Sequence, residues 1–310
     1  MNRILAAALM LAVIALAAPA FAPHDPDEII DVLGARHLRP GARVLVITRS
    51  DGSRIAASHV DTAGDTLTFV RADRPGRIPL QELGEAPSPR RFVLGTDAFG
   101  RDLLSRILHG ARMSIGVTLV AVGLGLVLGV GIGALAGYFG GVTDAGFMRL
   151  IDVLHAVPRI FLFLLCAALF GPSALLVGIV LGTTGWIGIA RITRGHVLSL
   201  RDTGFAAAAR AIGGSQRRVI LRHVLPNCAA PIAVAAVLLA ADTILAESAL
   251  SFIGVGVQPP AASWGTLIAA GRDGLHDAWW VMVFPGLSIA LTVMGLYAMA
   301  RRAIPGPGRG

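Results

Sequence analysis

The sequence has 310 residues, of which 55% are hydrophobic and only 15% are charged, and its mean hydropathy is +0.71. A soluble domain has roughly a quarter of its residues charged, so this excess of apolar residues, gathered in long runs, indicates an integral membrane protein. All 27 basic residues are arginine. The lack of lysine excludes a Walker A lysine, a Schiff-base lysine and a Ser–Lys dyad, so if ATP is involved, another subunit binds it.

The net charge of +8 does not point to nucleic acid, because the arginines flank apolar runs without an aromatic-rich basic surface. The charge is typical of the positive-inside bias of membrane proteins. Cys166 and Cys228 fall in or beside predicted spans and provide neither a disulfide framework nor a metal-ligand spacing. We therefore expect no nucleic-acid partner, no catalytic or metal site, and no cofactor bound by this chain.

The N-terminal third contains one apolar run followed by one long polar region. Residues 1–22 end in APAFA, which is similar to a signal-peptidase site, so they are either a cleaved signal peptide or an uncleaved first span. In the polar region that follows, β-prone runs at 43–47, 54–58 and 66–70 alternate with turn signals. They predict a small β-rich unit of two hairpins that closes near residues 77–80, with a disordered loop as the alternative.

The second and third predicted spans cover residues 113–138 and 146–170. The second carries glycines at every fourth position, which predicts a groove that a neighbouring helix can approach closely: Gly125, Gly129, Gly133 and Gly137. The third begins with charged residues at steps of three, three and four, which would share one helix face: Arg149, Asp152, His155 and Arg159. This stripe is interpreted either as an interhelical contact or as snorkelling at the interface, and Pro158 predicts a kink.

Three further spans are predicted at residues 174–189, 228–253 and 279–302. The fifth contains Asp242 and Glu247, which are functional candidates by position, although pairing with an arginine of another helix is the commoner explanation. Residues 191–222 contain seven arginines and one acidic residue, which indicates a cytoplasmic loop. With an uncleaved first span, the chain would cross the membrane six times, with both termini inside and the β-rich region outside.

The arginine-rich loop has a definite local pattern between residues 201 and 227. An alanine run at 206–211 favours a helix, Gly213 and Gly214 would end it, and Ser215 can cap a second helix that runs towards Pro226. The sequence therefore predicts a helix–glycine–helix corner against the cytoplasmic face of the membrane.

This corner, GFAAAARAIGGSQRRVILRHVLPN, resembles the cytoplasmic EAA loop of permease subunits of bacterial ABC importers, in the dipeptide/oligopeptide/nickel branch. Three further stretches are similar to that branch: LGTDAFGRDLLSRILHGAR at 94–112, MRLIDVLHAVP at 148–158 and LAESALSFIGVGVQPPAASWG at 245–265. Together these stretches span about residues 92–302 in continuous order.

The resemblance implies an all-α, MetI-like membrane domain in the bacterial inner membrane that forms half of a translocation pathway. The implied partners are a homologous permease, two ATP-binding subunits that use the ATP, a solute-binding protein outside, and membrane lipids. In the loop, the family's glycine falls on Gly213, its small residue on Ala208 or Ala209, and its terminal pair on Leu225-Pro226. The coupling residues implied are Ala207, Ala208, Ala209, Gly213, Ser215, Arg218, Arg222, Leu225 and Pro226; the intramembrane polar candidates are Arg149, Asp152, Asp242 and Glu247.

The sequence departs from the family at three places. Ala207 replaces the acidic residue that names the loop, His155 and Arg159 stand where the branch has apolar or small residues, and the β-rich stretch at 41–84 is larger than usual. The expected division is a signal-anchor span at 1–22, a periplasmic, partly β-rich segment at 23–92, a permease domain at 93–302 and a short cytoplasmic tail at 303–310. Peptides are the expected substrates; nickel chelates, other small solutes or a stand-alone secondary transporter are the alternatives.

Overall fold

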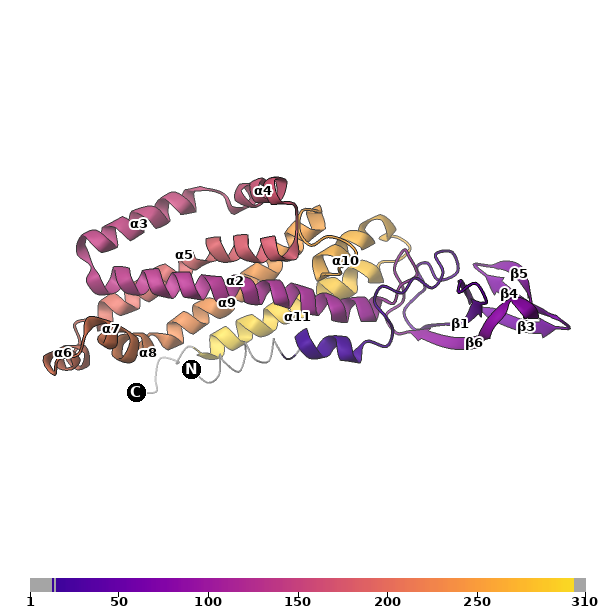
Figure 1. The fold of residues 1–310 in the computed structure, drawn as a ribbon, viewed down its shortest axis with the longest axis horizontal. Helices are drawn as coiled ribbons and strands as arrows, with labels where there is room; N and C mark the ends of the chain where they lie inside the picture. Colours follow the sequence, from indigo (N-terminus) through magenta and orange to yellow (C-terminus); the bar gives the residue numbers. More distant parts are fainter. Residues whose placement is uncertain (1–12, 14, 304–310) are drawn as a thin grey trace.

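The computed structural model describes residue 13 and residues 15–303. Most of the predicted first span and most of the predicted C-terminal tail therefore lie outside the described residues. The described chain forms a helical bundle with a β-rich module at one end and a group of short helical segments at the other (Figure 1). The apolar sequence runs form the bundle, and the polar N-terminal region forms the module.

Four described helices are long and apolar enough to cross a membrane. They are α2 (Leu103–Phe139), α5 (Ala174–Leu200), α9 (Ala229–Ile253) and α11 (Trp280–Ala303). Each contains most of a predicted span, so the predictions for the second, fourth, fifth and sixth spans are confirmed. The loop before α11 also contains α10 (Trp264–Gly271), followed by the turn η4 (Arg272–Gly274).

The third predicted span is wrong as a single helix. The chain forms α3 (Gly141–Ala156) and α4 (Arg159–Phe170), which meet at an angle of 75°. Pro158 has φ −61° and ψ 125° at this break, where its missing amide hydrogen and its ring cannot continue the α3 backbone. If the bent pair counts as one span, the described residues provide five candidate spans.

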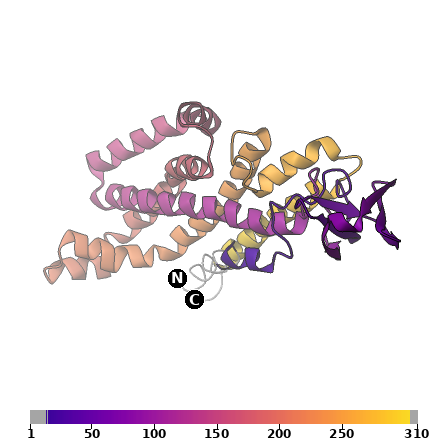
Figure 2. The same ribbon diagram turned by 45° about the vertical axis from the view of Figure 1, so that its right-hand side comes forward.

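The α3–α4 pair lies on the opposite side of the bundle from α11, as both the first view and the view turned by 45° show (Figures 1 and 2). Ile151 is the one residue of α3 that this chain buries, and α4 buries only Phe163 and Ala167. Most of the α3–α4 surface is therefore left free for lipid, water or another protein.

The glycine groove of α2 is occupied by α5. A Cβ atom added at Gly133 would lie 2.5 Å from the carbonyl oxygen of Ala190, and one at Gly137 would lie 2.6 Å from that of Arg194. Real Cβ atoms do not approach backbone this closely, so side chains larger than hydrogen would force the two helices apart. The predicted close approach is confirmed.

The β-rich module consists of two three-stranded antiparallel sheets in the orders β2-β1-β6 and β3-β4-β5. The strands are β1 (Ala42–Arg49), β2 (Arg54–Ala57), β3 (His59–Ala63), β4 (Thr66–Arg71), β5 (Arg74–Pro79) and β6 (Leu83–Phe92), with the turn η2 (Leu80–Glu82) between the last two. Ile47 faces Ile55 across the first sheet, and Leu67 faces Ile78 across the second. All four side chains join one apolar core, which holds the sheets together. The β-rich prediction is confirmed, with more strands than two hairpins would supply.

A partly buried ion pair ties the segment before β1 to the module. The Asp31 carboxylate accepts hydrogen bonds from the Arg71 guanidinium at 2.6 and 2.8 Å and from the amide of Ala56 at 3.1 Å. The side chain of Asp31 is only 1% exposed. This contact fixes residues 30–35 against β2 and β4, where Ile30 and Ala35 complete a second apolar core with Phe92.

Candidate functional site

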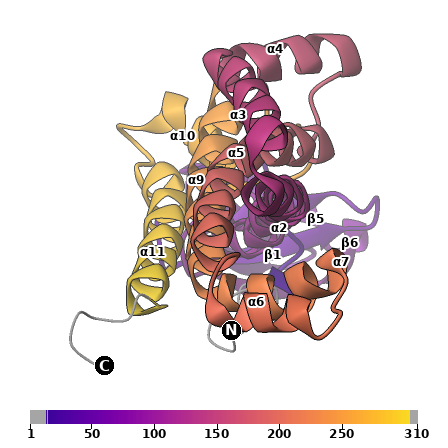
Figure 3. The ribbon, with the colours of Figure 1, turned by 90° about the vertical axis from the view of Figure 1, so that its left-hand side faces the viewer.

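The arginine-rich loop forms a compact corner at the end of the bundle opposite the β-rich module. It comprises α6 (Gly204–Ala211), α7 (Gln216–Val219), the π-helical turn η3 (Ile220–Val224) and α8 (Leu225–Asn227). Seen end-on, α6 and α7 lie across the end of the bundle (Figure 3). The predicted helix–glycine–helix arrangement is confirmed, and its second half is a continuous helical path of three segments that leads into α9.

Two glycines make the turn of this corner for different physical reasons. Gly213 has φ +84°, a left-handed conformation, and a Cβ there would meet open space. At Gly214 a Cβ would lie 2.4 Å from the carbonyl oxygen of Ala209, which accepts the Gly214 amide hydrogen at 3.1 Å. Ser215 then caps α7 by accepting the Arg218 amide at 3.4 Å. Backbone conformation therefore requires Gly213, and close packing requires Gly214.

The inner face of the corner packs onto the membrane helices. Ala206 and Ala209 of α6, and Val219 and Val224 of the second half, are buried in one cluster with Val197 of α5. Of the three alanines implied as coupling residues, Ala209 is buried, whereas Ala207 and Ala208 are exposed. The small residue needed for packing is thus Ala209. The missing acidic group at Ala207 would have pointed outward.

The outer face of the corner is positively charged. Residues 203–241 contain no acidic residue, and Arg210, Arg217, Arg218 and Arg222 are all exposed. Arg210 donates to the carbonyl oxygen of Arg201 at 2.7 Å. The other three border a hollow of about 290 Å³ with Ser215 and Leu221. The family-implied residues Leu225 and Pro226 lie at the start of α8, half-buried and exposed respectively.

The charged stripe predicted on the third span is divided by the helix break. Arg149, Asp152 and His155 remain on α3, but Arg159 begins α4, so the four side chains do not share one helix face. Asp152 accepts a hydrogen bond from Arg191 of α5 at 2.8 Å, which confirms an interhelical contact for that residue. Arg149 is exposed and makes no ion pair within residues 15–303.

The two acidic residues of α9 have different environments. Asp242 is exposed and accepts a hydrogen bond from Arg159 at 3.0 Å, so the expected pairing with an arginine of another helix is confirmed. For Glu247 that expectation is wrong. Its carboxylate is fully buried and accepts hydroxyl hydrogen bonds from Ser114 at 3.0 Å and Ser251 at 2.7 Å.

These two serines extend the contacts of Glu247 to the outer loop. The Ser114 hydroxyl oxygen accepts the Trp264 amide at 3.3 Å, and that of Ser251 accepts the Val257 amide at 3.0 Å. Glu247 therefore connects α2 and α9 with both ends of the segment that leads into α10. The sequence does not indicate this role, because serines carry no signal of long-range pairing.

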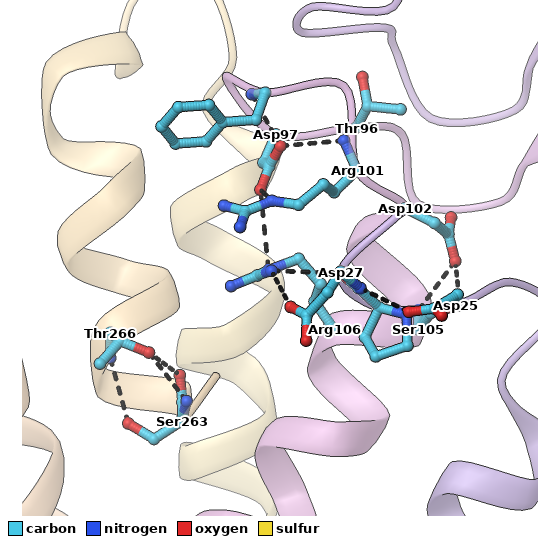
Figure 4. A network of polar contacts seen from close by, with 12 residues as sticks. Asp25, Asp27, Thr96, Asp97, Arg101, Asp102, Ser105, Arg106, Ser263 and Thr266 are labelled. Atoms are coloured by element: carbon cyan, nitrogen blue, oxygen red, sulfur yellow. Dashed lines mark hydrogen bonds and ion pairs between the residues drawn. The ribbon is translucent and has the colours of Figure 1, made fainter. Parts of the chain in front are cut away.

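A second polar network lies at the start of α2, within the 94–112 stretch (Figure 4). Asp102 caps α2 by accepting the Ser105 amide at 2.9 Å, and Asp97 accepts the amides of Phe99 and Arg101 at 2.9 and 3.0 Å. The buried Arg106 donates to Asp27 and to the carbonyl oxygen of Pro26, both at 3.1 Å. This network anchors the polar N-terminal segment to the bundle. The spacing of Asp102 and Ser105, an N-cap pattern, is the signal that could have indicated it.

The contacts of these sites are structural or electrostatic, and none forms a nucleophile–base pair aimed at a cavity. Within the described part of the chain, no three His, Cys, Asp or Glu side chains are placed to hold a metal ion.

Comparison with known proteins gives a consistent family. Residues 129–306 match the family model described as binding-protein-dependent transport system inner membrane component. The chain is 42% identical over 210 residues to a putative peptide transport system permease protein of Brucella suis, covering 68% of this chain and 71% of that protein. It is 40% identical over 209 residues to the di/tripeptide transport system permease protein DppC of Pseudomonas aeruginosa, covering 67% and 69%.

Comparison with solved structures supports the fold. A chain of the inward-facing MetNI methionine ABC transporter superposes with a TM-score of 0.51 at 16% identity, over 64% of this chain and 97% of that chain. At this identity the likeness concerns the fold alone, and it confirms the MetI-like arrangement of the helical part.

Proposed function

The chain belongs to the family of inner membrane components of binding-protein-dependent transport systems, and we propose that it is a permease subunit of an ABC importer for di- and oligopeptides. The observation that carries the substrate class is the 40–42% identity to permeases named for peptide, di/tripeptide and oligopeptide transport. Nickel chelates or other small solutes carried by the same machinery are the second candidates. A stand-alone secondary transporter fits poorly, because a positively charged docking corner has no role in it.

We propose that the corner couples the chain to an ATPase subunit. Its outer face presents Arg217, Arg218 and Arg222 on a surface without acidic residues, and its inner face is packed against α5 and α9. A force applied to α6 and α7 would reach both membrane helices through that apolar contact, because close-packed interfaces transmit displacement. With Ala207 in place of an acid, the complementary ATPase surface would carry the negative charge.

The proposed assembly contains this chain, a homologous permease, two ATP-binding subunits and a binding protein outside. The β-rich module lies at the end of the bundle away from the corner (Figure 1), so with a cytoplasmic corner the module would lie outside. There it would dock the binding protein or the partner permease. The proposed topology has six spans, with residues 1–22 as an uncleaved anchor and both termini in the cytoplasm.

Reconstitution tests this function. The complex is purified with its partner subunits, the ligand carried by its binding protein is identified, and ATP-dependent uptake of that ligand is measured in proteoliposomes. Accumulation of di- or tripeptides is the expected result. Uptake of a nickel chelate with no uptake of peptides would select the second candidate, and uptake driven by an ion gradient without ATP would contradict coupling to an ATPase.

A further inference from the structure

The Arg159–Asp242 pair lies at mid-membrane depth and is exposed. Asp242 is the fourteenth residue of α9, so at 1.5 Å per residue it lies about 20 Å from one end of the helix and about 17 Å from the other. The hydrocarbon core of a bilayer is about 30 Å thick, which places Asp242 near its middle. Even so, the side chains of Arg159 and Asp242 are 46% and 59% exposed in this chain.

Further polar side chains lie near this pair, among exposed apolar ones. Arg191 and Asp152 form a second exposed ion pair between α5 and α3. On α5, Thr183 is exposed two turns before Arg191. A hollow of about 230 Å³ lies at the break between α3 and α4, where His155 and Arg159 border it together with Thr184. Charged and hydroxyl side chains thus follow one another along this side of the bundle.

The opposite side of the bundle has a different composition. Residues 280–300 of α11 include no charged residue, and Leu287, Leu291 and Met294 are between 49% and 67% exposed. Such a face suits lipid, whereas ionised side chains exposed to hydrocarbon are unfavourable and are found facing protein or water. Because α3 and α4 also expose apolar side chains, such as Phe161 and Leu165, the exposed ion pairs, and not the overall composition of the surface, indicate contact with water on that side.

We infer that Arg159 and Asp242 form a binding site for zwitterionic solutes on the wall of the aqueous translocation pathway. The ion pair between Arg159 and Asp242 would open when a solute binds. The guanidinium of Arg159 would then bind the solute carboxylate, and the carboxylate of Asp242 would bind the solute ammonium group. An exposed ion pair is weak, so this exchange costs little. The site then binds loosely enough to release the solute, which passage through a pathway requires.

This site deepens the proposed function, on which it rests, because a peptide with free termini carries both charges. Asp144 and Arg194 form a matched control pair. This pair joins α3 to α5 instead of α4 to α9. Asp144 lies at the end of α3 opposite the break, and the side chains of Asp144 and Arg194 are less exposed, at 17% and 31%.

The first experiment measures contact with water in the whole importer reconstituted in proteoliposomes. In a background with Cys166→Ser and Cys228→Ala, a single cysteine is placed by Asp242→Cys, by Thr183→Cys, which keeps the ion pair, or by Leu291→Cys on α11. A charged, water-soluble methanethiosulfonate reagent should modify the first two and not the third. Saturating dipeptide with binding protein should slow modification of Asp242→Cys. The inference would be overturned if Asp242→Cys and Thr183→Cys were both modified no faster than Leu291→Cys. It would also be overturned if dipeptide did not slow the modification of Asp242→Cys.

The second experiment separates a binding role from a structural one. Uptake of a free dipeptide, its N-acetylated form and its C-amidated form is measured for wild type, Asp242→Asn, Arg159→Gln and Asp144→Asn. The same binding protein delivers all three peptides to every variant. For each peptide, the uptake rate of the variant is therefore divided by that of the wild type, and these ratios are compared. Asp242→Asn should slow uptake of the two peptides with a free ammonium group by about tenfold more than uptake of the acetylated peptide. Arg159→Gln should slow uptake of the two peptides with a free carboxylate by about tenfold more than uptake of the amidated peptide. Asp144→Asn should affect all three peptides equally.

Equal slowing of all three peptides by Asp242→Asn and Arg159→Gln would overturn the inference in favour of a structural ion pair. Failure of the proposed function looks different: the wild-type complex would then import no peptide at all. In that case the cysteine-labelling rates would still decide whether Asp242 lines a water-filled pathway.

Discussion

The carboxylate of Glu247 on α9 accepts a hydrogen bond from the hydroxyl of Ser114 on α2 at 3.0 Å, across 133 positions of sequence. Because the same hydroxyl oxygen accepts the amide of Trp264 at 3.3 Å, a single serine links two membrane helices to the start of α10. This junction lies far from the corner, so its integrity can be tested separately from coupling.

Replacing Glu247 by alanine should destabilise the junction. The substitution leaves the buried hydroxyls of Ser114 and Ser251 without their acceptor, at a cost of about 1–3 kcal/mol for each unsatisfied group. Thermal unfolding of the purified complex should shift to lower temperature and uptake should fall, while ATPase subunits still bind. Glu247→Gln, which keeps one carbonyl acceptor, should lose less thermal stability and less uptake than Glu247→Ala. Unchanged stability and uptake in Glu247→Ala would show that the junction is dispensable.

Replacing Gly213 by valine should uncouple ATP hydrolysis from uptake. At φ +84° a β-branched residue is strained by about 1–3 kcal/mol, although the space around it is open, so the corner should change shape. Gly213→Asn is the matched control, because asparagine tolerates the left-handed region. Inserted Gly213→Val complexes should hydrolyse ATP with little uptake, and Gly213→Asn should retain both. Normal uptake in the valine variant would show that the left-handed conformation is not needed.

Restoring an acid at Ala207 should weaken coupling in this protein. An exposed glutamate there would add a negative charge to a surface that otherwise carries only arginines, opposite the acidic ATPase surface that we propose. Binding of ATPase subunits, measured by co-purification against increasing salt, should be weaker for Ala207→Glu than for Ala207→Gln. If Ala207→Glu bound the ATPase subunits more strongly than Ala207→Gln, the ATPase surface opposite residue 207 would carry a basic group instead of an acidic one.

The β-rich module should lose stability in acid through Asp31. Burial raises the pKa of Asp31, but hydrogen bonds from Arg71 and from the amides of Ala56, Gly34 and Leu33 outweigh burial and lower the pKa below 3.8. A lowered folded-state pKa stabilises the fold fully above the unfolded pKa of about 3.9, and this contribution is lost as pH falls through the folded pKa. Amide-exchange protection in β1 and β2 should therefore drop below about pH 4.

The matched variants for this pH effect are Asp31→Asn and Asp65→Asn, the second at an exposed position of the turn before β4. Asp31→Asn should be less protected near pH 7 and nearly independent of pH in the acid range. Asp65→Asn should follow wild type. If amide-exchange protection in Asp31→Asn fell with pH as it does in the wild type, the loss of stability in acid would have to come from another carboxylate.

The sequence predicts the membrane helices and the corner well, because long apolar runs, Gly213-Gly214 and the Ser215 cap are local signals. It fails where structure depends on distant partners or on the size of a bend. Pro158 indicates a kink but not the 75° angle that separates Arg159 from the α3 stripe. The strand β6 contains prolines and no apolar alternation, so only its pairing with β1 makes it a strand.

The most direct test of the central claim measures peptide accumulation and ATP hydrolysis together in proteoliposomes that contain the whole importer. The account predicts that labelled dipeptide accumulates only with ATP and binding protein, and that Gly213→Val abolishes accumulation while hydrolysis continues. Accumulation without ATP, or wild-type accumulation by Gly213→Val, would contradict it.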